Sequence, residues 1–535
     1  MTLLAVDALS LSIHGQQILK NVSFDVRPGE VFGIIGESGS GKSMTAYAVT
    51  GLVPEGTKAS GSILLKGQPL LNQSEKIMCG IRGAEIGMVF QEPMTALNPV
   101  QTIGDQVAET VLVHGTASRR EARRIARQTL DRVGLPEPQF PLDRYPHELS
   151  GGQRQRVVIA MAIALQPKLL IADEPTTALD VTTQAQILDL LMSLVETDGM
   201  GLMLITHDLG IVANIADRIA IMRHGEIVET GDTSTLFAEM RHPYTKALFE
   251  ASGHVPVRSA VTGGDHPVLE VSELVRDYAL PRKSLFARPG RFRAVDHVSF
   301  SIRRGENLGL VGESGCGKST LTRAILALDP IQGGAIRIAG EAVSTEARVA
   351  RSIRRKMQVV FQDPYGSFNP RHKVERLVSE PFHLLDEQMS SNERRTRIVR
   401  ALENVGLSAS DGEKYIHEFS GGQRQRIAIA RALIIEPDLI ILDEAVSALD
   451  VSIRAQILDL LADLSSRLDL SYLFISHDLS VVRAITDRVL VMKEGRIVEE
   501  GETERVFRNP SHDYTRSLIA AAPDVAEALD KRQQT

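Results

Sequence analysis

The sequence is poor in cysteine and has no tryptophan: its 535 residues include only Cys79 and Cys316 as thiols. Two cysteines this far apart form neither a disulfide framework nor a metal-binding quartet, which favours a reducing compartment. An excess of basic residues is also missing. The net charge is −7 with both signs interspersed, so composition gives no indication of a nucleic-acid-binding surface.

Long apolar segments are missing as well. The longest apolar run, Val157 to Leu165, has about half of the ~18 to 20 residues needed to span a bilayer, and Gln166 and Pro167 end it. The segment Met1 to Ser10 contains an aspartate and no basic residue, so it lacks the charged start of a secretion signal. We therefore expect a cytosolic chain that does not cross a membrane by itself.

What the sequence does contain is a glycine-rich motif, present twice. Its copies are Gly36 to Ser43, Gly-Glu-Ser-Gly-Ser-Gly-Lys-Ser, and Gly312 to Ser319, Gly-Glu-Ser-Gly-Cys-Gly-Lys-Ser. Both fit the phosphate-binding loop Gly-x-x-x-x-Gly-Lys-Ser/Thr, which requires a strand before it and a helix after it. Apolar and then helical segments flank both copies: Val31 to Ile35 with Met44 to Val49, and Leu308 to Val311 with Thr320 to Leu326.

Each part of such a loop has an expected role. The glycines let the backbone turn tightly and bring its N–H groups to the phosphates, while the helix N-terminus adds a positive dipole end. Lys42 and Lys318 would contact the β- and γ-phosphates, and Ser43 and Ser319 would hold Mg²⁺. The nucleotide-binding residues expected are Gly36, Glu37, Ser38, Gly39, Ser40, Gly41, Lys42, Ser43, Gly312, Glu313, Ser314, Gly315, Cys316, Gly317, Lys318 and Ser319.

The repeat extends over the whole chain. Gly36 pairs with Gly312 at an offset of 276, and three further pairs share an offset of 270: Ser150 with Ser420, Asp173 with Asp443 and His207 with His477. The near-constant offset indicates a duplicated domain with a small insertion before the second loop. We expect a first domain at residues 1–251, a linker at 252–266 and a second domain at 267–535.

Periodicity predicts both strands and helices in each copy, which are the elements of an α/β fold. Alternating apolar residues indicate an antiparallel, half-buried sheet, and residues 119–133 and 393–405 have helical spacing with arginines on the opposite face. Such a run of arginines is more typical of a solvated helix face than of a nucleic-acid stripe. The alternating residues are Leu11, Ile13, Val22, Phe24 and Val26, repeated as Val298, Phe300 and Ile302.

The insertion at residues 279–293 is basic. It carries Arg282, Lys283, Arg288, Arg291 and Arg293. Its composition fits a solvated surface loop, and it also fits a contact with a partner or with acidic lipid. The sequence leaves both interpretations open.

Two apolar strands end in paired carboxylates, Leu169 to Glu174 and Leu439 to Glu444. A strand-end acid after a phosphate loop organises the Mg²⁺ shell, which is the role expected for Asp173 and Asp443. The next residues, Glu174 and Glu444, are placed to act as the base that orients the attacking water.

The segments Leu149 to Gln153 and Phe419 to Gln423 each contain Ser-Gly-Gly-Gln before an apolar helical run. Ser-x-x-Gln is a capping box, so Ser150 and Ser420 should begin helices. Adjacent glycines weaken the first turn, which indicates that something approaches the backbone closely. An anion such as a γ-phosphate would fit there.

These residues resemble the signature motif of the ATP-binding cassette ATPases, and the order of all motifs agrees. The resemblance implies two tandem nucleotide-binding domains, each with a RecA-like core, an antiparallel β subdomain and a helical signature subdomain. It implies that the signature of one cassette closes over the nucleotide of the other. It further implies Q-loop glutamines at Gln91 and Gln362, switch histidines at His207 and His477, and D-loop aspartates at Asp180 and Asp450.

The sequence departs from the family pattern in places. His14 stands where the first cassette would place an adenine-stacking aromatic, whereas Tyr278 is a candidate in the second. Asp-Glu-Pro-Thr at residues 173–176 becomes Asp-Glu-Ala-Val at 443–446. Because Glu444 is kept, we expect both sites to hydrolyse ATP. Cys316, beside Lys318 at a helix N-terminus, is expected to have a lowered thiol pKa.

Within the family, Phe90 to Pro99 and Phe361 to Pro370 resemble the oligopeptide, dipeptide and nickel importer ATPases, as do the motifs His242 to Thr245 and His512 to Thr515. The fused arrangement is similar to that of the glutathione and microcin C importers, and peptides are the favoured substrate. No cysteine follows Cys316, so no iron–sulfur cluster is expected.

The resemblance implies ATP and Mg²⁺ as ligands, two integral-membrane permeases and an external solute-binding protein as partners, and a peripheral location on the cytoplasmic face of the inner membrane. An alternative from another class is a soluble cassette pair acting on ribosomes or nucleic acid. Such proteins generally have a long charged helical linker, whereas Ser252 to His266 is short and weakly charged.

Overall fold

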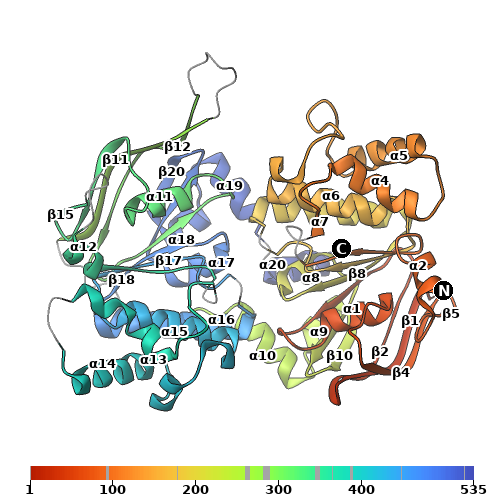
Figure 1. Cartoon of the computed structure of the whole chain (residues 1–535), viewed down its shortest axis with the longest axis horizontal. Helices are drawn as coiled ribbons and strands as arrows, with labels where there is room; N and C mark the ends of the chain where they lie inside the picture. Colours follow the sequence, from red (N-terminus) through yellow and green to blue (C-terminus); the bar gives the residue numbers. More distant parts are fainter. Residues whose placement is uncertain are drawn as a thin grey trace. The chain divides into compact units, whose positions relative to one another are not determined.

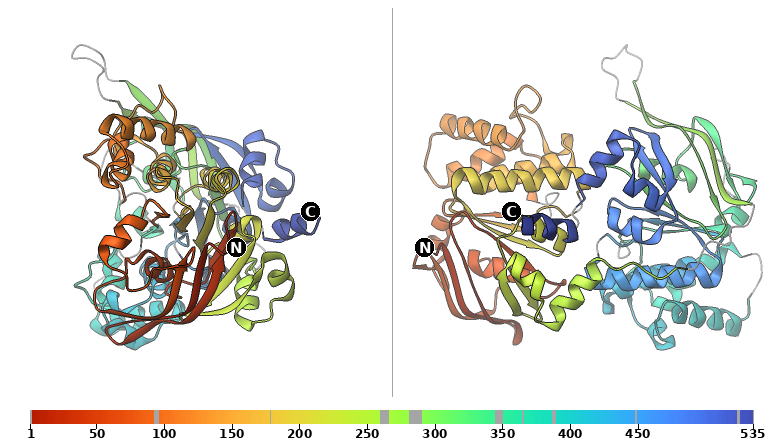
Figure 2. Two further views of the ribbon diagram at one scale, coloured as in Figure 1. Left: turned by 90° about the vertical axis from the view of Figure 1, so that its right-hand side faces the viewer. Right: turned by 180° about the vertical axis from the view of Figure 1, so that it is seen from behind.

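The computed structural model describes residues 2–91, 96–177, 179–258, 266–280, 290–343, 350–363, 366–385, 389–447, 449–522 and 525–534. The chain forms two compact units (Figures 1 and 2). Unit 1 comprises Met1–Leu179, Thr183–Ser252 and Pro523–Thr535, and unit 2 comprises Asp180–Thr182 and Gly253–Ala522. The domain boundaries expected from the sequence stay a prediction.

Unit 1 contains two sheets. The antiparallel sheet has the order β2-β1-β4-β5, and the larger sheet has the order β10-β9-β3-β8-β7-β6. In the larger sheet β9, β3, β8, β7 and β6 are parallel and β10 is antiparallel to β9. The strands are β1 (Leu4–Ile13), β2 (Gln16–Val26), β3 (Val31–Ile35), β4 (Thr57–Leu65), β5 (Gln68–Pro69), β6 (Ile86–Val89), β7 (Leu169–Asp173), β8 (Gly201–Thr206), β9 (Arg218–Arg223) and β10 (Glu226–Asp232).

Helices pack around the larger sheet of unit 1. Among them, α4 and α5 pack on each other and on α6, and these three form a group of their own (Figure 1). The helices of this unit are α1 (Lys42–Thr50), α2 (Glu75–Ile81), α4 (Ile103–Val113), α5 (Arg119–Arg132), the 3₁₀ turn η1 (Pro146–Glu148), α6 (Gly151–Ile163), α7 (Val181–Asp198), α8 (Leu209–Ile215), α9 (Thr233–Glu239) and α10 (Pro243–Ser252). Helix α20 (Val525–Gln534) also belongs to this unit, where it packs against α8 and α9.

Unit 2 repeats the two sheets, with the orders β12-β11-β14-β15 and β16-β17-β18-β13-β19-β20. In the second of these, β16, β17, β18, β13 and β19 are parallel, and β20 is antiparallel to β19. The strands are β11 (Pro267–Ala279), β12 (Arg291–Arg303), β13 (Asn307–Val311), β14 (Gly333–Ile338), β15 (Glu341–Ala342), β16 (Met357–Val360), β17 (Leu439–Asp443), β18 (Ser471–Ile475), β19 (Arg488–Lys493) and β20 (Arg496–Glu502).

The helices of unit 2 follow the same plan. They are α11 (Lys318–Ile325), α12 (Arg351–Lys356), α13 (Val374–Val378), α14 (Ser391–Asn404), α15 (Gly421–Leu433), α16 (Val451–Leu468), α17 (Leu479–Ile485), α18 (Thr503–Arg508) and α19 (Asp513–Ala520), with the 3₁₀ turns η2 (Glu380–Leu384), η3 (Ala409–Glu413) and η4 (Ile416–Glu418). Among the residues described, no helix is both long and apolar enough to span a membrane.

The central parallel strands are mostly apolar because both faces of the sheet are covered. Every residue of β3 and of β13 is buried, and the phosphate loops leave the ends of these two strands. The start of β3 is fixed by carboxylates: Asp217 Oδ2 accepts a hydrogen bond from the Val31 amide at 2.8 Å. In unit 2, Asp487 Oδ2 accepts from the Asn307 amide at 2.9 Å. Each loop therefore starts from a fixed strand.

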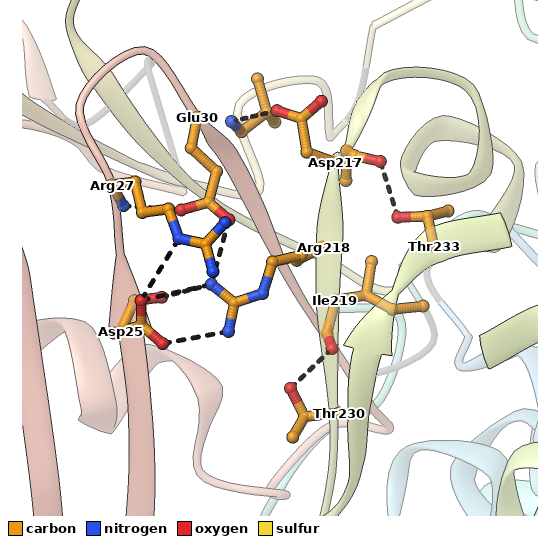
Figure 3. Close-up of polar contacts among 10 residues, drawn as sticks. Asp25, Arg27, Glu30, Asp217, Arg218, Ile219, Thr230 and Thr233 are labelled. Carbon is orange, nitrogen blue, oxygen red and sulfur yellow. Dashed lines mark hydrogen bonds and ion pairs between the residues drawn. The ribbon is translucent and has the colours of Figure 1, made fainter. Parts of the chain in front are cut away.

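An arginine beside Asp217 ties the two sheets of unit 1 together (Figure 3). Arg218 donates to Asp25 Oδ1 at 3.0 Å and to Glu30 Oε1 at 3.1 Å, and the side chain of Glu30 is only 7% exposed. Arg27 lies beside the same group, with its Nε 3.8 Å from Asp25 Oδ2. Because Asp25 lies on β2 and Arg218 on β9, the ion pairs join the antiparallel sheet to the larger one.

Each unit also includes residues that come directly after the other cassette in the sequence. Unit 2 includes the residues from Gly253 onward, and unit 1 includes Pro523–Thr535. In unit 2, Arg258 donates to the Ile485 carbonyl at 2.7 Å and to Asp487 Oδ1 at 2.9 Å. In unit 1, Arg532 of α20 donates to the Asn214 carbonyl at 3.1 Å. Arginine thus satisfies free carbonyl groups near the C-terminal ends of α8 and α17.

The fold class expected from the sequence is confirmed, and the expected strands and helices are present. The helices at 119–133 and 393–405 correspond to α5 and α14. The basic insertion is shorter than the sequence suggests, because Ala279 and Arg291 pair in the sheet and the Leu280 amide bonds the Gly290 carbonyl at 2.8 Å. Residues 281–289, with Arg282, Lys283 and Arg288, lie outside the described residues.

Candidate functional site

Each phosphate loop wraps around its own lysine. Lys42 Nζ donates to the carbonyls of Gly36 at 2.6 Å and Glu37 at 3.0 Å. Lys318 Nζ donates to Gly312 at 2.6 Å and to the carbonyl of Glu313 at 2.9 Å. Both lysines are only 6% exposed. The two loops therefore hold an ammonium group in the same way, at the N-terminus of α1 and of α11.

Each loop must begin with glycine, because the neighbouring strand of the sheet lies too close to its first residue for a side chain. A Cβ atom on Gly36 would lie 2.3 Å from the Met222 carbonyl oxygen of β9, and one on Gly312 would lie 2.2 Å from that of Met492 in β19. Gly41, the residue before Lys42, has a φ of 103°, which only glycine adopts readily. These glycines shape the loop whether or not a nucleotide is bound.

The serine after the lysine meets the strand-end aspartate. Ser43 Oγ donates to Asp173 Oδ1 at 3.1 Å, and the other carboxylate oxygen of Asp173 is buried without a hydrogen-bond partner among the described residues. Burial raises the pKa of Asp173 to about 6, while the Ser43 bond opposes this. In unit 2, burial likewise raises the pKa of Asp443 to about 6.

A buried oxygen without a partner, next to a serine hydroxyl, fits a hard divalent cation. Mg²⁺ is commonly held by one or two carboxylates together with phosphate oxygens and water. Within the described part of the chain, no group of three or more His, Cys, Asp or Glu is suited to hold a metal ion. The Ser43 hydroxyl and the Asp173 carboxylate fit a cation whose other ligands are phosphate oxygens and water.

The glutamate after each aspartate lies against the predicted switch histidine. His207 Nδ1 is 3.3 Å from Glu174 Oε1, and His477 Nδ1 is 3.3 Å from Glu444 Oε1. The two glutamates have φ values of 48° and 50°, in a region that costs a residue with a side chain about 1 to 2 kcal/mol. Strain of this kind is characteristic of functional sites.

The two glutamates differ in their other partners. Glu174 Oε2 accepts from Gln91 Nε2 at 3.1 Å and from Thr177 Oγ1 at 2.9 Å. At the matching place in unit 2, Ser447 Oγ donates to the backbone carbonyl of Glu444, at 2.9 Å. Gln362 makes no hydrogen bond to Glu444 in the part of the chain that the structure describes. Glu174 is therefore the more firmly held carboxylate.

The surroundings keep both glutamates ionised. Burial acts to raise the pKa of Glu174, but the bonds with His207 and Thr177 outweigh it and lower the pKa. Burial also opposes ionisation of Glu444, and His477 lowers its pKa. The pKa of His477 is raised in turn, because the attraction of Glu444 exceeds the effect of burial. Each pair keeps the carboxylate ionised, the form that accepts a hydrogen bond from water.

The histidines follow strands β8 and β18, and the next residue caps a helix. Asp208 accepts from the amides of Gly210 and Ile211, and begins α8. Asp478 caps α17 in the same way and pairs with Arg454 at 2.6 Å. The histidine side chain is thus held at a strand-to-helix junction.

The expected capping boxes are present. Ser150 accepts from the Gln153 amide at 3.3 Å, and the Ser150 amide donates to Gln153 Oε1 at 3.0 Å. Ser420 and Gln423 do the same at the start of α15. The D-loop candidates Asp180 and Asp450 precede α7 and α16.

The interpretation of the glycine pair after each serine needs a correction. A Cβ atom on Gly152 would lie 2.2 Å from Thr183 Cγ2, and one on Gly422 would lie 2.5 Å from Ile453 Cγ2. The second glycine is therefore needed for packing against the following helix, independently of an anion. A Cβ atom on Gly421 would have no other atom within 4 Å, and one on Gly151 would meet only a leucine methyl at 3.6 Å. The backbone at the first glycine is therefore not covered by neighbouring side chains.

The expectation for Cys316 is wrong. Its side chain is buried, with 7% exposure, and burial raises the pKa of its thiol although Lys318 Nζ lies 3.9 Å away. Removal from water disfavours the thiolate more than the nearby ammonium group stabilises it. Cys79, in contrast, is exposed on α2.

One adenine-stacking candidate lies in an antiparallel sheet and the other in a turn beside one. Tyr278 donates to Asp329 Oδ2 at 3.0 Å, and the Arg276 guanidinium lies 4.4 Å from its ring centre. His14 is in the turn between β1 and β2 with a φ of 48°. Their contact with adenine stays a prediction.

Residues 92–95 and 364–365, from the segments that resemble importer ATPases, are outside the described residues.

Sequence reasoning did not identify two contacts at these sites. Thr177 was not singled out, although a hydroxyl three residues after the glutamate is a recognisable signal for a turn that folds back. The hydroxyls of Tyr244 and Tyr514 contact the second residue of each phosphate loop. No local pattern predicts a bond between residues about 200 positions apart.

Comparison with known proteins agrees with this geometry. The model of the family described as "ABC transporter" matches residues 19–177 and 295–447. The model described as "Oligopeptide/dipeptide transporter, C-terminal region" matches residues 228–261 and 498–535. Both matches are double, as the repeat in the sequence predicts.

Two relatives match over nearly the full chain. The peptidoglycan transport ATP-binding protein YejF of Agrobacterium fabrum is 45% identical, over 99% of this chain and 98% of the relative. The glutathione import ATP-binding protein GsiA of Escherichia coli O157:H7 is 46% identical, over 99% of this chain and 91% of the relative. Since each region matched by the ABC transporter model carries a phosphate loop and a strand-end acid pair, this chain belongs to the ABC transporter family of ATPases, with two ATP-binding cassettes in one polypeptide.

Proposed function

We propose that this chain is the ATP-hydrolysing, energy-coupling subunit of an importer for peptides. The main support is the pair of regions matched by the oligopeptide/dipeptide transporter model, which contain the motifs His242 to Thr245 and His512 to Thr515. The names of the two relatives, for peptidoglycan transport and glutathione import, both concern solutes with peptide bonds. Glutathione or nickel import is the alternative within the family.

The proposed catalytic groups are the same in both cassettes. Glu174 and Glu444 are the bases that orient water, His207 and His477 hold the γ-phosphate, and Gln91 and Gln362 complete the sites. The support is that each glutamate lies 3.3 Å from its histidine on a strained backbone. The phosphate-loop residues 36–43 and 312–319 bind ATP, with Mg²⁺ on Ser43 and Asp173 and on Ser319 and Asp443.

Each ATP site is proposed to be composite, with Ser150 to Gln153 facing the second loop and Ser420 to Gln423 facing the first. A clamp of this kind positions the reacting groups, and positioning alone can lower a barrier by about 7 to 11 kcal/mol. The uncovered backbone at Gly151 and Gly421 is consistent with a phosphate at the start of each signature helix.

We also propose that the domains comprise residues 1–251 and 267–535.

The proposed partners are two integral-membrane permeases and a solute-binding protein on the other side of the membrane. The chain would be peripheral, on the cytoplasmic face of the inner membrane, and held there by the permeases. ATP-driven closure would move the permeases through contacts near Gln91 and Gln362. No nucleic acid is part of this proposal.

The decisive experiment measures uptake in a strain that lacks this protein. Labelled peptides, glutathione and nickel are supplied separately, and the strain is complemented with the wild-type chain or with Glu174→Gln plus Glu444→Gln. Peptide uptake restored only by the wild type supports the proposal. Restoration of glutathione or nickel uptake alone assigns the alternative substrate, and ATP-dependent co-sedimentation with ribosomes without any uptake would overturn the transport function.

A further inference from the structure

The tyrosines of the motifs at 242–245 and 512–515 contact the phosphate loops. Tyr244 Oη accepts a hydrogen bond from the Glu37 amide at 3.3 Å, and Tyr514 Oη accepts from the Glu313 amide at 2.9 Å. Glu37 and Glu313 are the second residues of the two loops. The same contact in both cassettes, over separations of about 200 residues, indicates a built feature of the nucleotide site.

A carboxylate holds each motif in place. Glu229 of β10 accepts from the Arg241 and His242 amides at 2.9 and 3.1 Å and from the Thr245 hydroxyl. Glu499 of β20 accepts from the amides of Ser511 at 2.7 Å and His512 at 3.1 Å.

The histidine then caps the helix that carries the tyrosine. His242 Nδ1 accepts from the Tyr244 amide, and His512 Nδ1 from the Tyr514 amide, both at 3.1 Å. The carboxylate and the histidine therefore both hold the segment that carries the tyrosine.

The tyrosine rings are also fixed. Tyr244 and Tyr514 are 7% and 8% exposed. The Arg223 guanidinium lies 4.7 Å from the Tyr244 ring centre, and Lys493 Nζ lies 4.9 Å from that of Tyr514. These cations end β9 and β19, the strands that neighbour β3 and β13. A hydroxyl on a buried ring held in this way keeps its position while the loop changes its contacts.

The lysine and the tyrosine bond the two backbone groups of the same loop residue. Lys42 Nζ donates to the carbonyl of Glu37 at 3.0 Å, while the amide of Glu37 donates to Tyr244. In a complex with ATP, Lys42 would contact the phosphates and its bonds to the loop carbonyls would weaken. The tyrosine would then be the main support of that part of the loop, and its hydroxyl would stabilise the nucleotide-bound state more than the free state.

We propose that Tyr244 and Tyr514 are positioning residues for ATP, each holding the second residue of its phosphate loop in the nucleotide-bound shape. This inference rests on the proposed function of the loops. It gives the motif of the transporter C-terminal region a task at the nucleotide site of its own cassette. Loss of one neutral hydrogen bond should raise the dissociation constant of the nucleotide about 2- to 10-fold.

The test removes the hydroxyl and keeps the ring, in the full-length chain. Tyr244→Phe is combined with Lys318→Ala, so that binding reports on the first loop, and Tyr514→Phe is combined with Lys42→Ala. The dissociation constant of a fluorescent ATP analogue with Mg²⁺ is compared with that of the lysine variant alone. Hydrogen exchange of the loop peptide is followed with nucleotide bound, and it should be faster in the phenylalanine variants.

The matched control is Tyr472→Phe. Tyr472 is fully buried, and its hydroxyl donates to the Leu461 carbonyl at 3.2 Å, away from the loops. We expect this variant to unfold at a lower temperature with unchanged nucleotide affinity. Steady-state kinetics of the two single motif variants should show a raised KM for ATP with kcat nearly unchanged.

The outcomes separate this inference from the function on which it rests. A wild-type chain that does not bind the ATP analogue overturns both. If the wild type binds, but the Tyr244→Phe and Tyr514→Phe variants bind equally well and differ only in thermal stability, like Tyr472→Phe, the tyrosines are structural and the inference fails alone.

Discussion

Glu174 Oε1 lies 3.3 Å from His207 Nδ1, on a backbone whose φ of 48° is unfavourable for a glutamate. Strand β7 and the turn after it impose this conformation, and the Glu174 amide bonds the Ile205 carbonyl of β8 at 2.8 Å. The glutamate and the histidine therefore follow neighbouring strands of the sheet, and the backbone brings their side chains together. A pair held in place by the sheet needs little rearrangement during reaction.

Because both cassettes contain this pair, both sites should hydrolyse ATP. Glu174→Gln and Glu444→Gln, made separately, remove the base from one site, where hydrolysis should fall about 10²- to 10⁴-fold. With coupled sites, the steady-state ATPase rate of each variant should fall far below half of the wild-type rate. An unchanged rate in either variant would refute hydrolysis at two sites, and nucleotide binding by both variants serves as the folding control.

The ion pairs of Arg218 should contribute more to the free energy of unfolding than the ion pair of Arg27, which lies nearby. Arg218 is 17% exposed and bonds two carboxylates, whereas Arg27 is 60% exposed and lies 3.8 Å from Asp25. Arg218→Ala leaves Glu30 buried without its cation, so it should lower the free energy of unfolding by about 2 to 3 kcal/mol.

Arg27→Ala is the matched control and should cost below about 0.5 kcal/mol. Urea unfolding followed by circular dichroism measures both variants. Equal effects would mean that the joint between the two sheets of unit 1 does not depend on Arg218.

The two cysteines should differ strongly in reactivity. Cys79 is exposed, whereas Cys316 is buried and its thiol pKa is raised by burial. Since the thiolate is the reactive form, a disulfide reagent at pH 8 should label one cysteine rapidly and the other slowly. Cys79→Ser should remove the rapid phase, and Cys316→Ser should keep it. A rapid phase that survives Cys79→Ser would show that reagents enter the second loop.

The contribution of Glu499 to stability should depend on pH. Burial acts to raise its pKa, but hydrogen bonds from Ser511 and from the His512 amide outweigh burial and lower the pKa to about 2, from an ordinary value of 4.5. The carboxylate therefore stabilises the folded state fully above about pH 4.5, and this contribution is lost as the pH falls from 4.5 toward 2.

Glu499→Gln should accordingly lower the thermal midpoint at pH 7 and lower it less at pH 4. Thermal unfolding of both proteins over this pH range measures the difference. A difference in midpoint that stays constant with pH would mean that the charge of Glu499 plays no part in holding the motif.

The sequence predicts the central strands well because their pattern is continuous. Strands of a parallel sheet covered on both faces have unbroken apolar runs, and Val31 to Ile35 and β3 coincide. Helix α1 begins at Lys42, two residues before the expected segment, because Gly41 adopts a left-handed conformation and the helix starts within the loop motif. Boundaries of this kind depend on backbone angles that periodicity does not contain.

The positions of the acid pairs and histidines also follow from the sequence, since residues at the carboxyl ends of parallel strands meet at one edge. What the sequence does not predict are contacts between distant residues. The bond from the Glu37 amide to Tyr244 depends on how α10 lies against β9 and β10. The burial of Cys316 depends on packing around the second loop, and charge alone therefore gave the wrong sign for its pKa.

Helix α20 belongs to unit 1 although it is encoded roughly 270 residues after α10. Chains are made from the N-terminus at about 5 to 20 residues per second, so residues 525–534 leave the ribosome on the order of 15 to 55 seconds after the first cassette. During that interval the surfaces of α8 and α9 that α20 covers, and the Asn214 carbonyl, must stay in contact with water. The first cassette to be synthesised is therefore the last to acquire all of its packing, and the final step in building unit 1 is the arrival of a helix from the far end of the chain.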